Sequence, residues 1–93
     1  MMTTKQTITV EILHNLGLHL RAAGVIVQTT SNFKAKVTIE YNGIVANGKS
    51  IMGILALAAP CGSILEITTE GEDAKACLDT LRNLIVNKFH FES

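Results

Sequence analysis

The chain has 93 residues, of which 47% are hydrophobic and 17% are charged. These values predict that residues 1–93 form one small globular domain with a single core, and they exclude a disordered chain. Eight basic and eight acidic residues give a formal net charge of zero, and there are three Phe, one Tyr and no Trp. We therefore expect no nucleic-acid-binding surface, because such surfaces are basic and use aromatic side chains to stack on bases.

The sequence also bears on the location of the protein. Residues 1–6 lack the basic and apolar segments of a signal peptide, and the longest apolar run, residues 51–59, is far shorter than a membrane span and stops at Pro60. We therefore expect a soluble, cytoplasmic protein without a membrane partner. Cys77 falls on an apolar helix face and is expected in the core, whereas Cys61 lies in a turn. Neither cysteine has a partner at metal-binding spacing, and a disulfide framework would need more cysteines.

The first part of the chain predicts a strand, a helix and a second strand. Apolar and polar residues alternate over residues 7–12, which is typical of a half-buried strand, and residues 14–18 form the following loop. Residues 19–30 carry apolar side chains at helical spacing. Although the β-branched run 25–27 also suits a strand, a helix gives a connection of sensible length between two strands. Residues 33–41 alternate most clearly and predict the second strand.

A hairpin and a short helix follow. Asn42-Gly43 accepts the positive φ angles of a two-residue hairpin turn, so residues 44–47 are expected to form the return strand. Ser50 is a good N-cap residue, and residues 51–57 are expected to form a short helix. Pro60-Cys61-Gly62 ends this apolar segment.

The last part of the chain predicts a strand and a long helix. Residues 63–69 alternate, and the turn at 71–73 places Glu72 and Asp73 in the first turn of the next helix, where acids complement the dipole. Residues 74–85 follow helical spacing, whereas the tail 88–93 has no clear pattern and is expected to fray. The predicted order is β-α-β-β-α-β-α. An α+β open-faced sandwich, with a four-stranded, mainly antiparallel sheet and three helices on one face, buries these apolar stripes most simply.

A histidine and an arginine lie where a loop leads into the first predicted helix. Unpaired N–H groups and the positive end of the helix dipole would hold a phosphoryl group at His19, and a neutral imidazole can attack phosphorus directly. The same helix end lowers the cost of deprotonating the ring, and Arg21 offers a planar fork of donors matched to phosphate oxygens. These residues alone leave another interpretation open, in which His19 only caps or packs on the helix.

Ser50 marks a second candidate site at the start of the short helix. A phosphate there would lie over free N–H groups, although a plain N-cap role also accounts for this serine. The helix is apolar on nearly every side through Ile51, Met52 and Leu55. So short a helix cannot bury all of them against one sheet, so either another element covers some of them or some form a docking patch.

Together these stretches resemble the HPr family, the histidine-containing phosphocarrier proteins of the bacterial phosphoenolpyruvate-dependent phosphotransferase system. The matching motifs are Gly-Leu-His-x-Arg at 17–21, Asn-Gly-Lys-Ser-Ile-Met-Gly-Ile at 47–54 and Glu-Gly-Glu-Asp at 70–73. The resemblance covers nearly the whole chain. It implies a non-enzymatic phosphoryl carrier of sugar transport with no cofactor and no metal, and we expect a monomer.

The resemblance also implies roles for single residues. His19 would accept a phosphoryl group on Nδ1 from Enzyme I and pass it to EIIA-type proteins, and Arg21 would help to hold the phosphate. Ser50 would be the serine that an HPr kinase/phosphorylase modifies in many bacteria, which regulates the carrier. The expected partner-binding patch consists of Leu20, Ile51, Met52 and Leu55.

The chain departs from the usual pattern of the family at two positions. Leu20 and Ala22 stand where most members have a small residue and a proline. Proline would pre-set the first helical turn, and Leu20 adds bulk beside the imidazole, so we expect effects on transfer rate and partner choice rather than on the fold.

Two alternatives stay open. A regulatory HPr-like protein, of a non-transport or nitrogen-type branch, would act through Ser50 phosphorylation and docking to an enzyme or a transcription regulator. His14 and His19 could instead bind a metal, although no carboxylate or cysteine lies at a suitable spacing.

Overall fold

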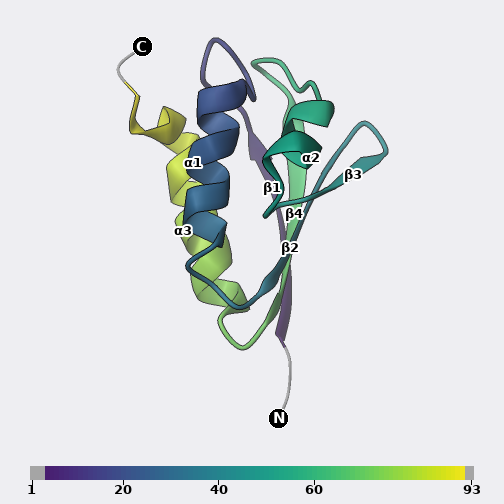
Figure 1. The fold of residues 1–93 in the computed structure, drawn as a ribbon, viewed down its shortest axis with the longest axis vertical. Coiled ribbons are helices and arrows are strands. Elements are labelled where there is room, and N and C mark those ends of the chain that lie inside the picture. The colour runs from purple at the N-terminus through teal and green to yellow at the C-terminus, as the bar shows by residue number, and fades with distance from the viewer. Residues whose placement is uncertain (1–3, 92–93) are drawn as a thin grey trace.

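The computed structural model describes residues 4–91. Its elements are β1 (Thr4–Glu11), α1 (Leu20–Thr30), β2 (Lys36–Tyr41), β3 (Ile44–Asn47), α2 (Ile51–Ala56), β4 (Ile64–Gly71), α3 (Ala74–Val86) and the short 3₁₀ turn η1 (Lys88–His90). All strand pairs are antiparallel, in the order β1-β4-β2-β3, and the helices lie on one side of the sheet (Figure 1). The predicted α+β open-faced sandwich and the order of its elements are therefore confirmed.

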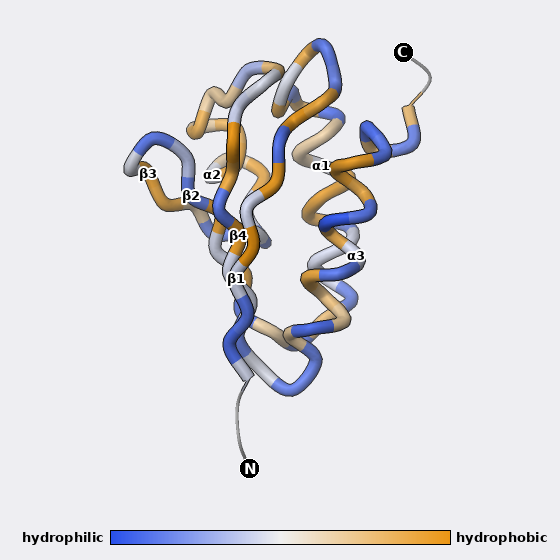
Figure 2. Tube along the Cα trace, turned by 180° about the vertical axis from the view of Figure 1, so that it is seen from behind, coloured by the Kyte–Doolittle hydropathy of each residue, from blue (hydrophilic) through white to orange (hydrophobic). Residues whose placement is uncertain are grey.

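The core lies between the sheet and the two long helices. Figure 2 shows α1 and α3 as a layer beside the sheet, with apolar segments in both layers. From the sheet, Ile39, Leu65 and Ile67 are fully buried, while polar residues at alternate positions stay on the open face. Each large side chain buried in this way stabilises the fold by about 1.5–3 kcal/mol. The helices contribute Ala22, Ala23 and Ile26 from α1 and Cys77, Leu81 and Ile85 from α3.

Two predictions about single positions are confirmed by this packing. Cys77 is buried in the core, and its burial raises the pKa of the thiol. Asn42 and Gly43 both have positive φ, 56° and 80°, and join β2 to β3 as a two-residue turn. Within residues 4–91, the helices are all too short or too polar to cross a lipid bilayer.

Hydrogen bonds from the end of α1 fix the start of α2. The Thr30 hydroxyl donates to the Gly48 carbonyl oxygen at 2.9 Å, and Lys49 Nζ donates to the Phe33 carbonyl oxygen at 2.7 Å. A Cβ at position 48 would lie 2.3 Å from Val37 Cγ1, so the chain can pass close to β2 only with glycine there. This segment thereby sets the position at which α2 begins.

The prediction that Glu72 and Asp73 lie in the first turn of the last helix is wrong. α3 begins at Ala74, and its first turn contains no acidic residue. The Asp73 carboxylate instead accepts hydrogen bonds from the backbone N–H groups of Lys34 and Ala35, both at 2.9 Å. Because those N–H groups bind a side chain, they are not available to a strand ladder. This explains why β2 begins at Lys36 and not at residue 33 as predicted.

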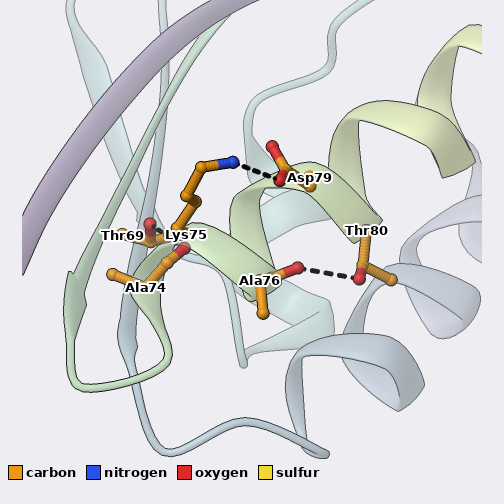
Figure 3. Close-up of polar contacts among 6 residues, drawn as sticks. All are labelled: Thr69, Ala74, Lys75, Ala76, Asp79 and Thr80. Carbon is orange, nitrogen blue, oxygen red and sulfur yellow. Dashed lines mark hydrogen bonds and ion pairs between the residues drawn. The ribbon is translucent and has the colours of Figure 1, made fainter.

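Side-chain contacts also stabilise the first turns of α3 (Figure 3). The buried Thr69 hydroxyl donates to the Ala74 carbonyl oxygen at 2.7 Å and closes the turn between β4 and α3. Lys75 and Asp79 form an exposed ion pair at 2.9 Å. An exposed pair of this spacing contributes about 0.3–0.5 kcal/mol, so the buried threonine bond is the contact that fixes the turn.

The prediction that the C-terminal tail frays is wrong for residues 88–91. Lys88, Phe89 and His90 all have positive φ, between 54° and 60°, and form one 3₁₀ turn. Phe89 is only 3% exposed, so its burial in the core offsets the unfavourable backbone conformation. The end of the chain thus runs back beside the start of α1 (Figure 1). The rest of the predicted tail, residues 92–93, lies outside the described residues.

We expect Asp73→Asn to lower the melting temperature at neutral pH, because an amide accepts the two backbone N–H groups less well than a carboxylate. The Lys34 N–H, and with it the Ala35 N–H, holds the pKa of Asp73 below its ordinary value of 3.8. The stabilisation is therefore fully present above the ordinary pKa and is lost as the pH falls through the lowered one. Thermal unfolding of both proteins between pH 7 and pH 2 should give curves that converge at the acid end. Glu72→Gln, which removes an exposed charge next to it, is the control; equal melting temperatures of Asp73→Asn and wild type at pH 7 would contradict the prediction.

Candidate functional site

The loop between β1 and α1 holds His19 through contacts with the segment after α2. The Leu18 N–H donates to the Ala59 carbonyl oxygen at 2.9 Å, and the Leu18 side chain is buried. Gly17 has a φ of 63°, and a Cβ there would lie 2.4 Å from the Ala59 carbonyl oxygen and 2.8 Å from Pro60 Cα. Only glycine allows this close backbone approach, so the loop has a single way to pack.

His19 is the N-cap residue of α1, which agrees with the predicted start of the helix. Its backbone is extended, with φ of −80° and ψ of 177°, and its side chain makes no capping hydrogen bond. Within residues 4–91, the backbone N–H groups of Leu20, Arg21 and Ala22 have no hydrogen-bond partner, whereas the Ala23 N–H donates to the His19 carbonyl oxygen. The imidazole is thus not used for capping, and the free N–H groups next to it favour an anion.

Aromatic rings surround the inner side of His19. The ring centroids of His14 and Phe91 lie 5.1 Å and 5.7 Å from that of His19, and they lie 5.6 Å from each other. Phe89 lies 5.8 Å from Phe91. His14 is buried, and its Nδ1 accepts a hydrogen bond from the Leu16 N–H at 3.2 Å, which fixes its ring. We call His14, His19, Phe89 and Phe91 the aromatic cluster.

The two ring nitrogens of His19 differ in their surroundings. Nε2 is fully covered and has no hydrogen-bond partner, although the residue as a whole is half-exposed. Nδ1 is not among the buried ring atoms without a partner and is thus the more accessible nitrogen of the two. Since a neutral imidazole has one protonated nitrogen, a proton on Nε2 leaves the Nδ1 lone pair free to attack.

Several effects favour the neutral form of His19. Burial lowers the pKa of His19 below its ordinary value of 6.5, and the nearby His14 and Arg21 lower the pKa further. The ring is then more often neutral, and so nucleophilic, at neutral pH. The helix end predicts a lowered pKa of His19, but the largest cause is the partial burial of the ring.

Arg21 extends from the first turn of α1 over the aromatic cluster. Its guanidinium carbon lies 4.0 Å from the centroid of the Phe91 ring. Within residues 4–91, the guanidinium forms no ion pair and donates no hydrogen bond. Its donors are therefore uncommitted, and a phosphate group could accept from several of them at once.

Ser50 is the N-cap residue of α2, as predicted. Its Oγ accepts a hydrogen bond from the Gly53 N–H at 3.0 Å, and the residue is half-buried. A cap of this kind contributes about 1 kcal/mol to stability. The capping role is confirmed, and phosphorylation of Ser50 stays a prediction.

Exposed apolar side chains lie at the start of α1 and on α2, whose end, and not its start, adjoins the loop before α1 (Figure 1). Met52 is 75% exposed, Leu20 is 65% exposed and Ile51 is 37% exposed. Leu55, also predicted for this surface, is half-buried and packs against the core, so it offers little area to a partner. Leu16, from the loop before His19, is 69% exposed. We call Leu16, Leu20, Ile51 and Met52 the apolar rim.

Sequence reasoning missed three residues near His19. Leu16 lies in a loop, where an apolar side chain gives no periodic signal. His14 was considered only as a metal ligand, and Phe91 was assigned to a fraying tail. The alternation of Phe89, His90 and Phe91 was the available signal for an ordered tail with one buried and one site-facing ring.

The metal alternative gains no support from this geometry. Within residues 4–91, no three His, Cys, Asp or Glu side chains are placed to hold a metal ion together. His14 and His19 are close, but His14 Nδ1 binds a backbone N–H and His19 Nε2 is covered. A stable zinc site would need further thiolate, imidazole or carboxylate ligands beside them.

The fold and the site together define a class of protein. A half-exposed imidazole and a guanidinium without an ion pair or hydrogen bond in residues 4–91 lie at one exposed end, further apolar side chains are exposed on α2, and a shallow hollow lies elsewhere, on the open face of the sheet. A surface of this kind cannot enclose a small substrate, and it suits docking to other proteins. These features define a small domain that presents a histidine and an arginine to other proteins.

Comparisons with known proteins identify the family. The family profile described as PTS HPr component phosphorylation site matches residues 6–87. Phosphocarrier protein HPr of Treponema pallidum (strain Nichols) is 45% identical over 84 residues, which cover 90% of this chain and 96% of that protein. The crystal structure of HPr-C-His from Thermoanaerobacter tengcongensis superposes with a TM-score of 0.90 at 36% identity, covering 95% of this chain and 99% of that one. The chain belongs to the HPr family, the non-enzymatic phosphocarriers of the phosphotransferase system.

We expect Gly17→Ala to destabilise the fold by about 2–3 kcal/mol, because its Cβ would overlap the backbone of Ala59 and Pro60 at a positive φ. Gly43→Ala is the matched control, since Gly43 also has a positive φ but no atom lies within 4 Å of its added Cβ. That control should cost only about 1–2 kcal/mol. Urea unfolding measures both losses, and equal losses would show that the close approach to Ala59 is not a constraint.

Proposed function

We propose that His19 is the phosphoryl acceptor of this phosphocarrier and that it reacts through Nδ1. The observation that carries the proposal is the asymmetry of the ring: Nε2 is covered and has no hydrogen-bond partner in residues 4–91, which leaves Nδ1 to react, and the ring belongs to the N-cap residue of α1. We take residues 1–93 as one HPr-like domain that works as a monomer in the cytoplasm. Enzyme I, charged by phosphoenolpyruvate, is the proposed donor, and EIIA-type proteins are the proposed acceptors.

In the proposed transfer, the Nδ1 lone pair attacks the phosphorus atom carried by Enzyme I. The new N–P bond forms as the bond to the donor breaks, and the donor keeps the bonding electron pair. The proton on Nε2 stays in place, so this chain needs no general base. The phosphoryl oxygens then lie near the free N–H groups of Leu20 to Ala22 and the Arg21 donors. Attack by an EIIA-type acceptor reverses these steps.

Such a reaction depends chiefly on positioning, because little covalent chemistry remains for the carrier to perform. The apolar rim offers Leu16 and Leu20, which flank His19 in the chain, and Met52 on α2 for docking. Each partner can then bring its own catalytic groups to the same exposed nitrogen. An open site is a requirement of this role, since donor and acceptor must both reach His19.

We expect Enzyme I and phosphoenolpyruvate to add one acid-labile phosphate to the wild-type chain and none to His19→Ala. The fold should persist in the variant, because the His19 side chain makes no hydrogen bond within residues 4–91. Intact mass before and after acid treatment gives the result, and circular dichroism checks the fold. His90→Ala, which removes an exposed histidine, should accept phosphate normally. Phosphate uptake by His19→Ala would refute the assignment, and no uptake by the wild type with Enzyme I of the same organism would favour the regulatory function below.

A second function is favoured by the place of Ser50 directly before the exposed Ile51 and Met52. We propose that an HPr kinase/phosphorylase phosphorylates Ser50 and thereby controls docking at the apolar rim. A dianion at the start of α2 would repel acidic partner surfaces and stabilise the short helix. A regulatory HPr-like protein of a non-transport or nitrogen-type branch, with a transcription regulator as partner, would use the same device.

We expect Ser50→Asp to slow phosphoryl transfer from Enzyme I, because a negative charge then lies beside the rim. Ser50→Ala should transfer at nearly the wild-type rate but lose about 1 kcal/mol of stability with the cap to the Gly53 N–H. Transfer rates over a range of Enzyme I concentrations and urea unfolding provide the two measurements. Wild-type rates and wild-type partner binding in Ser50→Asp would count against a regulatory role.

A further inference from the structure

The Arg21 guanidinium packs against the ring of Phe91. The guanidinium carbon lies 4.0 Å from the ring centroid, and within residues 4–91 the group has no carboxylate or carbonyl partner. An arginine without a partner samples many rotamers, and ordering it at the moment of reaction has an entropic cost. The aromatic contact lowers that cost before any phosphoryl group arrives.

The chemistry of this contact suits an anion site. A guanidinium bound through its face to an aromatic ring is held by electrostatic attraction to the ring quadrupole. Its N–H donors lie in the guanidinium plane, so stacking does not consume them. A carboxylate partner would hold Arg21 as well, but it would occupy those donors and repel a phosphoryl group.

The backbone conformation of residues 88–90 directs the chain so that the Phe91 ring lies against Arg21. Lys88, Phe89 and His90 all take the left-handed conformation, which is unfavourable for residues other than glycine. Burial of Phe89 keeps the turn in place, and the next ring outward is Phe91. Strained backbone next to a reactive group is a common sign of a functional constraint.

Phe91 also covers the inner side of His19. Its ring centroid is 5.7 Å from that of His19, and the His14 ring centroid lies 5.1 Å from that of His19. One side chain of the C-terminal segment thus contacts both residues of the proposed phosphoryl site.

We propose that Phe91 is a positioning residue for phosphoryl transfer, which holds the Arg21 guanidinium beside His19 with its in-plane donors free. This inference rests on the proposed function of His19. It assigns a role in the reaction to the C-terminal segment, in addition to the loop before α1. Phe91 acts through Arg21, so removing Phe91 affects the rate only while Arg21 is present.

The kinetic test measures phosphoryl transfer from Enzyme I with the chain as the varied substrate. Phe91→Ala should lower kcat about two- to fivefold, which corresponds to the usual strength of an exposed cation–π contact, and should leave KM unchanged. Phe91→Leu keeps an apolar side chain but no ring, and should fall as far as Phe91→Ala. Phe91→Tyr should restore the wild-type rate, and His90→Ala in the same turn is the matched control.

A double-mutant cycle with Arg21→Ala separates positioning from a general loss of structure. The loss on Phe91→Ala should disappear in the Arg21→Ala background. Wild-type kcat in Phe91→Ala, full rescue by leucine, or an equal loss in both backgrounds would each overturn the inference.

A second measurement does not depend on transfer. In the NMR spectrum of wild-type protein, the Nε–H resonance of Arg21 should be shifted by the Phe91 ring current, and this shift should vanish in Phe91→Ala and Phe91→Leu. Failure of the wild type to accept phosphate would refute the proposed function at His19, whereas an unshifted Arg21 resonance would refute the role of Phe91 alone.

Discussion

The structure of the site depends on one close contact between backbones. Gly17 and Leu18 pack against Ala59 and Pro60, so the loop before α1 rests directly on the segment that follows α2. This contact joins two parts of the chain that are about forty residues apart, and it fixes the position of His19 relative to α2. Because α1 begins immediately after the loop, the N–H groups of its first turn, which have no partner within residues 4–91, lie at this end of the fold together with the exposed Leu16 and Leu20. Without this contact, the loop would not hold His19 at a fixed position relative to α2.

The sequence predicts the regular elements well because their signals are local. Strand alternation and helical spacing repeat every few residues, and the hairpin and the Ser50 cap each depend on one or two residue types. Contacts across the chain were less predictable. Asp73 looks like a helix-dipole acid, yet it binds the N–H groups of Lys34 and Ala35, whose position depends on the sheet.

The same distinction applies to the site. His19 and Arg21 could be proposed from the sequence because a histidine and an arginine at a helix start form one short motif. His14 and Phe91, in contrast, approach His19 only after both ends of the chain have folded around α1 and α3. Leu20, which is expected in the partner-binding patch, is 65% exposed and belongs to the apolar rim. Ala22 is fully buried in the core.

The open form of the site agrees with the chemistry of a phosphoryl carrier. A phosphoryl group must be held well enough to survive between partners, yet every partner must reach it, so a closed pocket is excluded. The chain provides fixed groups near the His19 ring, whose Nε2 is covered: backbone N–H donors from α1 and a guanidinium that packs on an aromatic face. The chain has a formal net charge of zero, so long-range attraction contributes little to finding partners. Under the proposed function, recognition would depend on the apolar rim at short range, which would account for large exposed side chains near a site whose reaction is wholly polar.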